Sequence, residues 1–191
     1  MDATGSSTQI PVLFAGAATR VKILTVQHAV PKRKVTNELV LAAIRERNKY
    51  ELDERTQAVV ERQLTHHFAA AGTQVRYIAD EDERPIEFLL DAGRRALTAA
   101  DLAPEDIDLL IYTGVGRGWL EPATANVVQS ELKLVNATCF DILDACVSWL
   151  RAMHVAHAFI RSGVYHRCLI VNCESGFRDY VDLDFARLRE I

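Results

Sequence analysis

The sequence predicts an α/β fold with a mixed, mostly parallel sheet and crossover helices. Strand-like and helix-like segments alternate over residues 86–175, as they do where helices connect parallel strands. The segment 107–113 (IDLLIYT) is apolar on both of its faces, which is typical of a parallel strand buried between two helix layers. A chain of 191 residues is long enough for one sizeable domain with its own core.

The N-terminal part of the chain predicts less regular structure than the rest. Residues 1–19 are polar and indicate a loose segment, whereas branched apolar residues over 20–30 predict a strand. A basic cluster, Pro31–Lys34, follows this strand. It is interpreted either as a solvated turn or as a docking patch for a phosphate-bearing carrier or nucleotide. Thr36 or Asn37 then caps a helix. Residues 48–75 predict a charged helical flap or insertion.

The remaining elements are expected in alternating order. They are a short strand at 74–80, a helix at 86–102, strands at 107–113, 137–143 and 166–175, and helices at 121–134 and 146–163. Pro122 suits the first turn of its helix, and Gly163 suits the end of the last one.

Composition and charge exclude several classes of function. With 22 Lys and Arg against 26 Asp and Glu, the net charge is −4, so no nucleic-acid or membrane-surface partner is expected. No apolar run is long enough to span a membrane. The spacing of the four cysteines fits neither a zinc site nor a secreted disulfide framework, and His154 and His157 lack a third metal ligand. We therefore expect a cytoplasmic protein with reduced thiols, no metal and no cofactor.

Cys146 lies where a strand pattern gives way to a long apolar helix. The free N–H groups and the dipole of a helix start favour an anion there, and so a thiolate that could accept an acyl group. Position alone equally allows a small buried hydrophobic residue at 146. Cys139, Cys168 and Cys173 lie inside apolar strand runs, where a structural role is expected.

The stretch from Phe140 onwards (FDILDACVSWLRAMHVAHAFIRSGVYHRCLIVNCES) resembles the active-site segment of the thiolase superfamily. It is most similar to the ketoacyl-ACP synthase III branch, whose pattern Phe-Asp-x-x-x-Ala-Cys is matched here by Phe140, Asp141, Ala145 and Cys146. Further motifs (VPKRKVTNELV, VRYIAD and FLLDAGRRALTAADLAPEDIDLLIYTG) extend the resemblance over about residues 20–180. The resemblance implies the N-terminal half of a thiolase-like αβαβα fold, covering residues 20–191, with Cys146 as the nucleophile and its backbone N–H in an oxyanion hole.

A second motif, GVGRGWLEPATANVV, resembles the enzymes that join two fatty acyl-CoA chains head to head in olefin synthesis. In those enzymes the glutamate before the proline reaches across the dimer and acts as a base, and Glu121 stands at that position. Without the resemblance, Glu121 would be an acid favoured by a helix dipole. The resemblance also assigns Thr113, Val147 and Trp149 to substrate binding.

The sequence departs from the family in its extent and in the residues beside the cysteine. The family's second half, which carries a histidine, usually an asparagine and an oxyanion-hole glycine, has no counterpart here, and none of the six histidines matches a catalytic position. We therefore expect a complementing chain, or the rest of a cut polypeptide, and a dimer of such pairs. Val147 and Ser148 replace a frequent small-residue–glycine pair, and Trp149 replaces a phenylalanine.

Three functions are compatible with these observations. The first is an acyltransferase half whose Cys146 is acylated by an acyl-CoA or acyl-carrier thioester for Claisen condensation, in fatty acid or polyketide biosynthesis. The second is a non-catalytic structural or regulatory subunit of a ketosynthase complex, which the bulk of Val147 and Trp149 would suit. The third, a stand-alone thiol-dependent transferase or hydrolase, lacks a suitably placed base.

Overall fold

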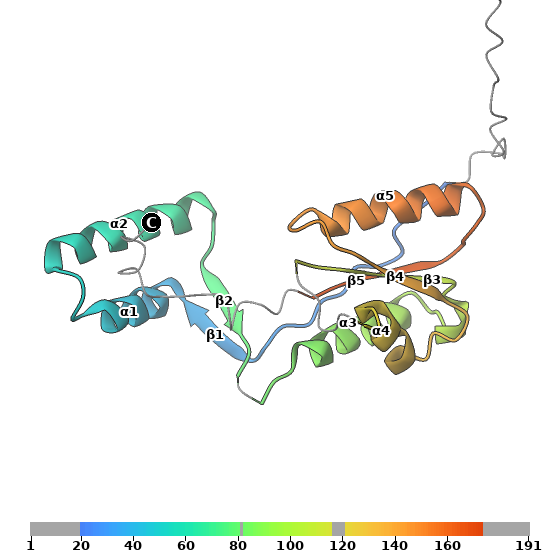
Figure 1. Ribbon diagram of the computed structural model, residues 1–191, viewed down its shortest axis with the longest axis horizontal. Coiled ribbons are helices and arrows are strands. Elements are labelled where there is room, and N and C mark those ends of the chain that lie inside the picture. The colour runs from blue at the N-terminus through green and yellow to red at the C-terminus, as the bar shows by residue number, and fades with distance from the viewer. Residues whose placement is uncertain (1–19, 81, 116–120, 174–191) are drawn as a thin grey trace, which may run out of the picture.

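The computed structural model describes residues 20–80, 82–115 and 121–173, and its centre is a three-stranded parallel sheet. The strands are β3 (Leu109–Thr113), β4 (Thr138–Ile142) and β5 (Cys168–Asn172), and their spatial order is β4-β3-β5 (Figure 1). All five residues of β3 are buried, because β3 pairs on both sides and is covered on both faces. The register aligns Thr113 with Ile142 and Asn172, so all three strands end at one edge.

Helices cover both faces of this sheet. The helices α3 (Pro85–Ala99) and α4 (Thr124–Leu132) lie on one face, and α5 (Ser148–Arg161) lies on the other (Figure 1). Successive residues of β3 point to opposite faces, as in any strand. Leu110 therefore joins the core with α3 and α4, while Ile111 packs with Ala152 of α5. A short 3₁₀ helix, Pro104–Asp106, connects α3 to β3.

A second unit, which we call the N-terminal lobe, lies to one side of the sheet (Figure 1). It consists of β1 (Arg33–Thr36), α1 (Asn37–Asn48), α2 (Glu54–Ala70) and β2 (Val75–Ile78), and the two strands pair antiparallel. The guanidinium of Arg45 on α1 donates to both carboxylate oxygens of Glu61 on α2, at 2.8 and 2.7 Å. Burial is sparse, since α2 has no buried residue and the lobe's buried apolar side chains are Ile44 and Leu52.

The predicted strand at residues 20–30 is wrong, because no secondary structure forms there. Branched apolar residues favour an extended backbone, but a strand also needs a hydrogen-bonded neighbour. The segment runs beside β5 without joining its ladder, and Ile23 and Val26 remain 66% and 81% exposed. The prediction of a basic turn over Pro31–Lys34 is also wrong for its last two residues. They begin β1, which starts at Arg33 and pairs with β2.

The alternating part of the chain agrees with the sequence-based prediction. Each helix and strand expected between residues 86 and 173 is present, with ends shifted by a few residues. Thr36 caps α1 by accepting a hydrogen bond from the Leu39 N–H at 3.4 Å. The last helix begins at Ser148 rather than Cys146, and Gly163 takes a left-handed φ of 75° just after its C-cap.

Removing side-chain volume from β3 is expected to destabilise the whole sheet. Leu110 is fully buried in the core with α3 and α4, so Leu110→Ala should lower the free energy of unfolding by about 2–5 kcal/mol. Urea unfolding followed by circular dichroism measures this loss. Leu39→Ala, at a site that is 55% exposed, is the control and should change stability by less than about 1 kcal/mol.

Candidate active site

Cys146 occupies the turn between the C-terminal end of β4 and the start of α5, and its side chain is exposed. The preceding residue, Ala145, has a left-handed φ of 45°, which is uncommon for a residue other than glycine. Two backbone hydrogen bonds tighten the turn, from the Val147 N–H to the Asp144 carbonyl (3.1 Å) and from the Ser148 N–H to the Ala145 carbonyl (3.2 Å). The turn thus presents the thiol at the surface, just before the first turn of a helix.

The charges around this turn are balanced locally. Arg151, in the first turn of α5, donates to one carboxylate oxygen of Asp144 through Nε (3.1 Å) and a terminal nitrogen (2.9 Å). This pairing neutralises a carboxylate two residues from Cys146, where an isolated negative charge would oppose a thiolate. The start of α5 adds the positive end of the helix dipole. Cys146 therefore lies beside a paired carboxylate and just before a helix N-terminus.

The other cysteines have surroundings that disfavour reactivity. Burial, together with the nearby Asp108 carboxylate, raises the pKa of Cys168 to about 12. Burial and the Asp141 carboxylate likewise raise the pKa of Cys139, whose Sγ lies 3.1 Å from Gln129 Oε1. Cys173 is partly buried against the core, with its Sγ 3.5 Å from the Pro85 carbonyl. These observations fit the structural role predicted for the three.

Glu121 is exposed and lies just before α4, joined to Pro122 by a cis peptide bond. The start of α4 is fixed to β4, because the N–H groups of Thr124 and Ala125 donate to the two carboxylate oxygens of Asp141 at 3.0 and 2.8 Å. Asp141 lies five positions before Cys146. The segment of Glu121 and the turn of Cys146 are therefore both anchored to β4.

Two of the three residues assigned to substrate binding lie beside the thiol. Val147 and Trp149 directly flank the start of α5 and are about half exposed, at 48% and 49%. Thr113 differs, because it is fully buried at the end of β3. Its hydroxyl donates to the Val171 carbonyl (3.2 Å) and accepts from the Asn172 side chain (3.1 Å), so it is engaged within the sheet.

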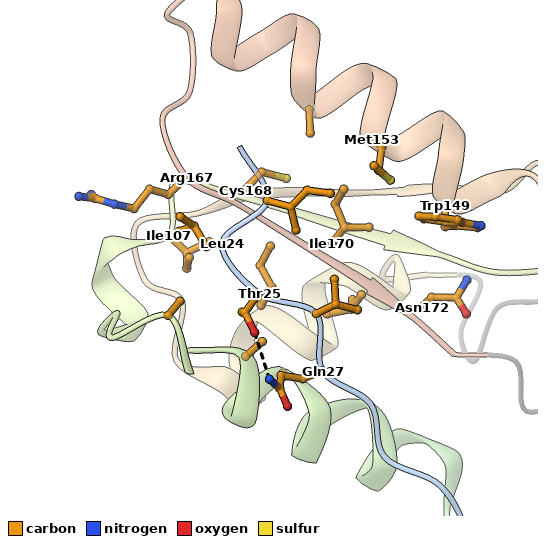
Figure 2. A pocket seen from close by; sticks show the side chains of 18 of the residues that line it. Leu24, Thr25, Gln27, Ile107, Trp149, Met153, Arg167, Cys168, Ile170 and Asn172 are labelled. Atoms are coloured by element: carbon orange, nitrogen blue, oxygen red, sulfur yellow. Dashed lines mark hydrogen bonds between the residues drawn. The ribbon is translucent and has the colours of Figure 1, made fainter. Parts of the chain in front are cut away.

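A large groove separates residues 20–27 from β5, α3 and α5 (Figure 2). Its volume is about 1910 Å³, and its lining includes Leu24, Cys146, Trp149, Met153 and Ile170. Pockets for small molecules usually have about 300–1,000 Å³. The groove is therefore larger than a usual small-molecule pocket, and Cys146 forms part of its wall.

Sequence reasoning overlooked Asp141, Ser148 and Arg151 as supports of the site. Asp141 was part of a family motif, but its capping of α4 depends on strand pairing that the sequence does not display.

In the part of the chain that the structure describes, no group of three His, Cys, Asp or Glu side chains could hold a metal ion. No helix among the described residues is long and apolar enough to cross a membrane.

Comparison with known proteins identifies several β-ketoacyl-[acyl-carrier-protein] synthases III among the relatives. The family model of 3-oxoacyl-[acyl-carrier-protein] synthase III matches residues 140–188, which include Cys146. The β-ketoacyl-[acyl-carrier-protein] synthase III of Caldanaerobacter subterraneus is 34% identical over 104 residues, or 54% of this chain and 31% of the relative. The synthase of the same name from Erythrobacter litoralis is 31% identical over 147 residues, or 77% and 41%.

Solved structures agree with these matches. The 3-oxoacyl-[acyl-carrier-protein] synthase III of Aquifex aeolicus has a TM-score of 0.65 at 28% identity, over 85% of this chain and 47% of that one. A variant of OleA from Xanthomonas campestris has a TM-score of 0.66 at 26% identity, over 81% and 43%. This chain spans less than half the length of each of these four proteins. Its sequence and its α/β fold place it with the thiolase-like condensing enzymes of the 3-oxoacyl-[acyl-carrier-protein] synthase III type.

Proposed function

We propose that this chain is the acyl-accepting half of a Claisen-type condensing enzyme. The observation that carries the proposal is the exposed Cys146 at the start of α5, inside the segment that matches the synthase III family. In the proposed step, the Cys146 thiolate attacks the carbonyl of an acyl-CoA or acyl-carrier thioester. The carrier thiolate leaves and takes up a proton, and the acyl group stays on Cys146.

Condensation needs more than the acylated cysteine. Removal of a proton or of carboxylate from the second thioester requires a base or hydrogen-bond donors beside the acyl group. We assign the base to Glu121, acting across a dimer, and the donors to the histidine and asparagine of a complementing half. Glu121 is exposed and so accessible to a partner subunit, and the contacts of Asp141 with the start of α4 hold the segment that follows it, which supports this assignment.

The groove supports completion by a second half. The sheet order leaves β5 paired on one side only within the described residues, and the facing segment, residues 20–27, pairs with no strand there. Unpaired strand edges and apolar walls are costly in water, and another part of a fold normally covers them. The relatives contain further chain, since the parts that match this chain make up 31–47% of their lengths. We propose a separate complementing chain, or the rest of a longer polypeptide, in a cytoplasmic dimer of such pairs.

A non-catalytic subunit is the second candidate. The observation in its favour is the bulk beside the thiol, because Val147 and Trp149 stand where the family has smaller residues or a phenylalanine. In that case the chain would stabilise or regulate a ketosynthase without accepting an acyl group. The following experiment separates the two candidates.

Incubation of the protein with an acyl-CoA should add one acyl group to Cys146, detected by mass spectrometry of the intact protein and its peptides. Cys146→Ala should abolish the adduct. Cys168 should stay unmodified at pH 8, because its pKa of about 12 leaves it almost entirely as a thiol until the pH approaches that value. An adduct that persists in Cys146→Ala, or no adduct in the wild-type protein, would contradict the nucleophile assignment.

Glu121→Gln separates acylation from condensation. In the completed enzyme, Cys146 should still be acylated, whereas condensation with a second thioester should slow about 10²–10⁴-fold, as expected for loss of a general base. Glu131→Gln, an exposed change near the other end of α4, is the matched control. Equal condensation rates in the two variants would remove Glu121 from the mechanism.

The chain without its complement should expose the groove. We expect it to bind the dye anilinonaphthalene sulfonate and to self-associate in light scattering. Leu24→Ser, in the groove at 52% exposure, should reduce dye binding more than Leu39→Ser, which is 55% exposed on α1. A compact monomer of residues 1–191 that binds no dye would argue against an obligate complement.

A further inference from the structure

Ser148 is the first residue of α5, and its side chain is 1% exposed. It stands two residues after Cys146. Buried hydroxyl groups are nearly always hydrogen-bonded, so the partners of this one show what it holds in place. They belong to the turn that carries the thiol and to the central strand.

The Ser148 hydroxyl contacts the two residues that precede Cys146 in the turn. Its Oγ accepts a hydrogen bond from the Asp144 N–H at 2.8 Å and lies 2.6 Å from the Ala145 carbonyl oxygen, to which it donates. The hydroxyl thus binds the two residues that immediately precede Cys146. Because Asp144 is also held through its carboxylate by Arg151, both ends of that residue are fixed to the first turn of α5.

A third contact connects the turn to the sheet. Ser148 Oγ lies 3.1 Å from the carbonyl oxygen of Gly114, the residue after β3. The single hydroxyl proton is shared between this carbonyl and that of Ala145. Since β3 is completely buried, Gly114 continues the most constrained strand of the structure. The hydroxyl thereby holds the turn against the end of a buried strand rather than against a loop.

The turn needs such support because of Ala145. Its left-handed φ of 45° is unfavourable for a residue with a Cβ atom and persists only where surrounding contacts enforce it. This conformation determines the direction in which the chain leaves towards Cys146. A hydroxyl that contacts the Ala145 carbonyl and the Asp144 N–H holds the peptide group that follows Ala145 and the one that precedes Asp144.

We infer that Ser148 is a positioning residue, which holds the Asp144–Cys146 turn against the end of β3 and so sets the geometry of acyl transfer to Cys146. The inference rests on the proposed role of Cys146 as acyl acceptor. Ser148 touches backbone groups and acts only through them.

The test compares Ser148→Ala and Ser148→Gly with the matched control Ser162→Ala. Ser162 lies at the other end of α5, where its hydroxyl donates to the Phe159 carbonyl at 2.9 Å, so its loss costs a similar hydrogen bond far from the thiol. Two rates are measured by mass spectrometry: alkylation of Cys146 by iodoacetamide, and acylation by acyl-CoA over a range of concentrations.

Both Ser148 variants should acylate about tenfold more slowly at saturating acyl-CoA, with half-saturation within about twofold of wild type. Ser162→Ala should retain the wild-type rate, and Ser148→Thr, which keeps the hydroxyl, should recover most of it. Wild-type acylation rates in Ser148→Ala or Ser148→Gly, or equal slowing in Ser162→Ala, would overturn the inference.

The alkylation rate and a hydrogen-exchange measurement keep the result interpretable. Alkylation needs no acyl substrate, so slower alkylation in the Ser148 variants supports the positioning role even where wild-type protein forms no acyl adduct, a result that would defeat only the proposed function. Hydrogen exchange of the Asp144 N–H in wild-type protein tests the contact without any variant. Strong protection is expected, and exchange at the rate of an unstructured amide would overturn the inference even where the variants fail to fold.

Discussion

The parallel pairing of β3 with both β4 and β5 is the constraint on which the rest of the structure depends. The pairing buries every residue of β3 and divides its side chains between two cores, one under α3 and α4 and one under α5. It also brings the C-terminal ends of the three strands to one edge. The segments after β3 and β4 leave from that edge, and they carry Glu121 and Cys146. The candidate site is therefore a consequence of strand register, which the buried apolar residues enforce.

Around that edge, side chains in the sheet and in the helices hold backbone groups of neighbouring elements. Asp141 reaches from β4 to the start of α4, and Ser148 reaches from α5 to the end of β3. Both contacts pair a side chain with the main chain of another element, so they fix loops that have little regular structure of their own. The same edge opens into the groove beside β5, and Cys146 forms part of the wall of that groove.

The sequence predicted the part of the fold in which local pattern and tertiary partners agree. The alternation after residue 86 was correct because each strand there finds a neighbour within the chain. Residues 20–30 carry an equally strong strand pattern, yet the described residues offer them no ladder, and pattern alone cannot reveal a missing neighbour. Arg33–Thr36 shows the reverse case, since four residues with two cations became a strand once Val75–Ile78 lay alongside. Cys146 could be proposed as a site residue from the resemblance of its segment together with its place before a helix, because its position alone equally allowed a small buried hydrophobic residue. Ser148 could not, because its importance depends on where Gly114 lies, which no spacing in the sequence encodes.

The sparse burial in the N-terminal lobe has a consequence for how the chain loses structure. Stability is not uniform in a protein, and segments with few buried apolar contacts open at lower free energy than the core. The lobe has its own strand pair and an exposed Arg45–Glu61 ion pair, and such surface ion pairs contribute little. The lobe is therefore expected to open at a lower free energy than the sheet in which β3 pairs. Substitutions on α2 would then alter how often this unit opens and leave the register that places Cys146 unchanged.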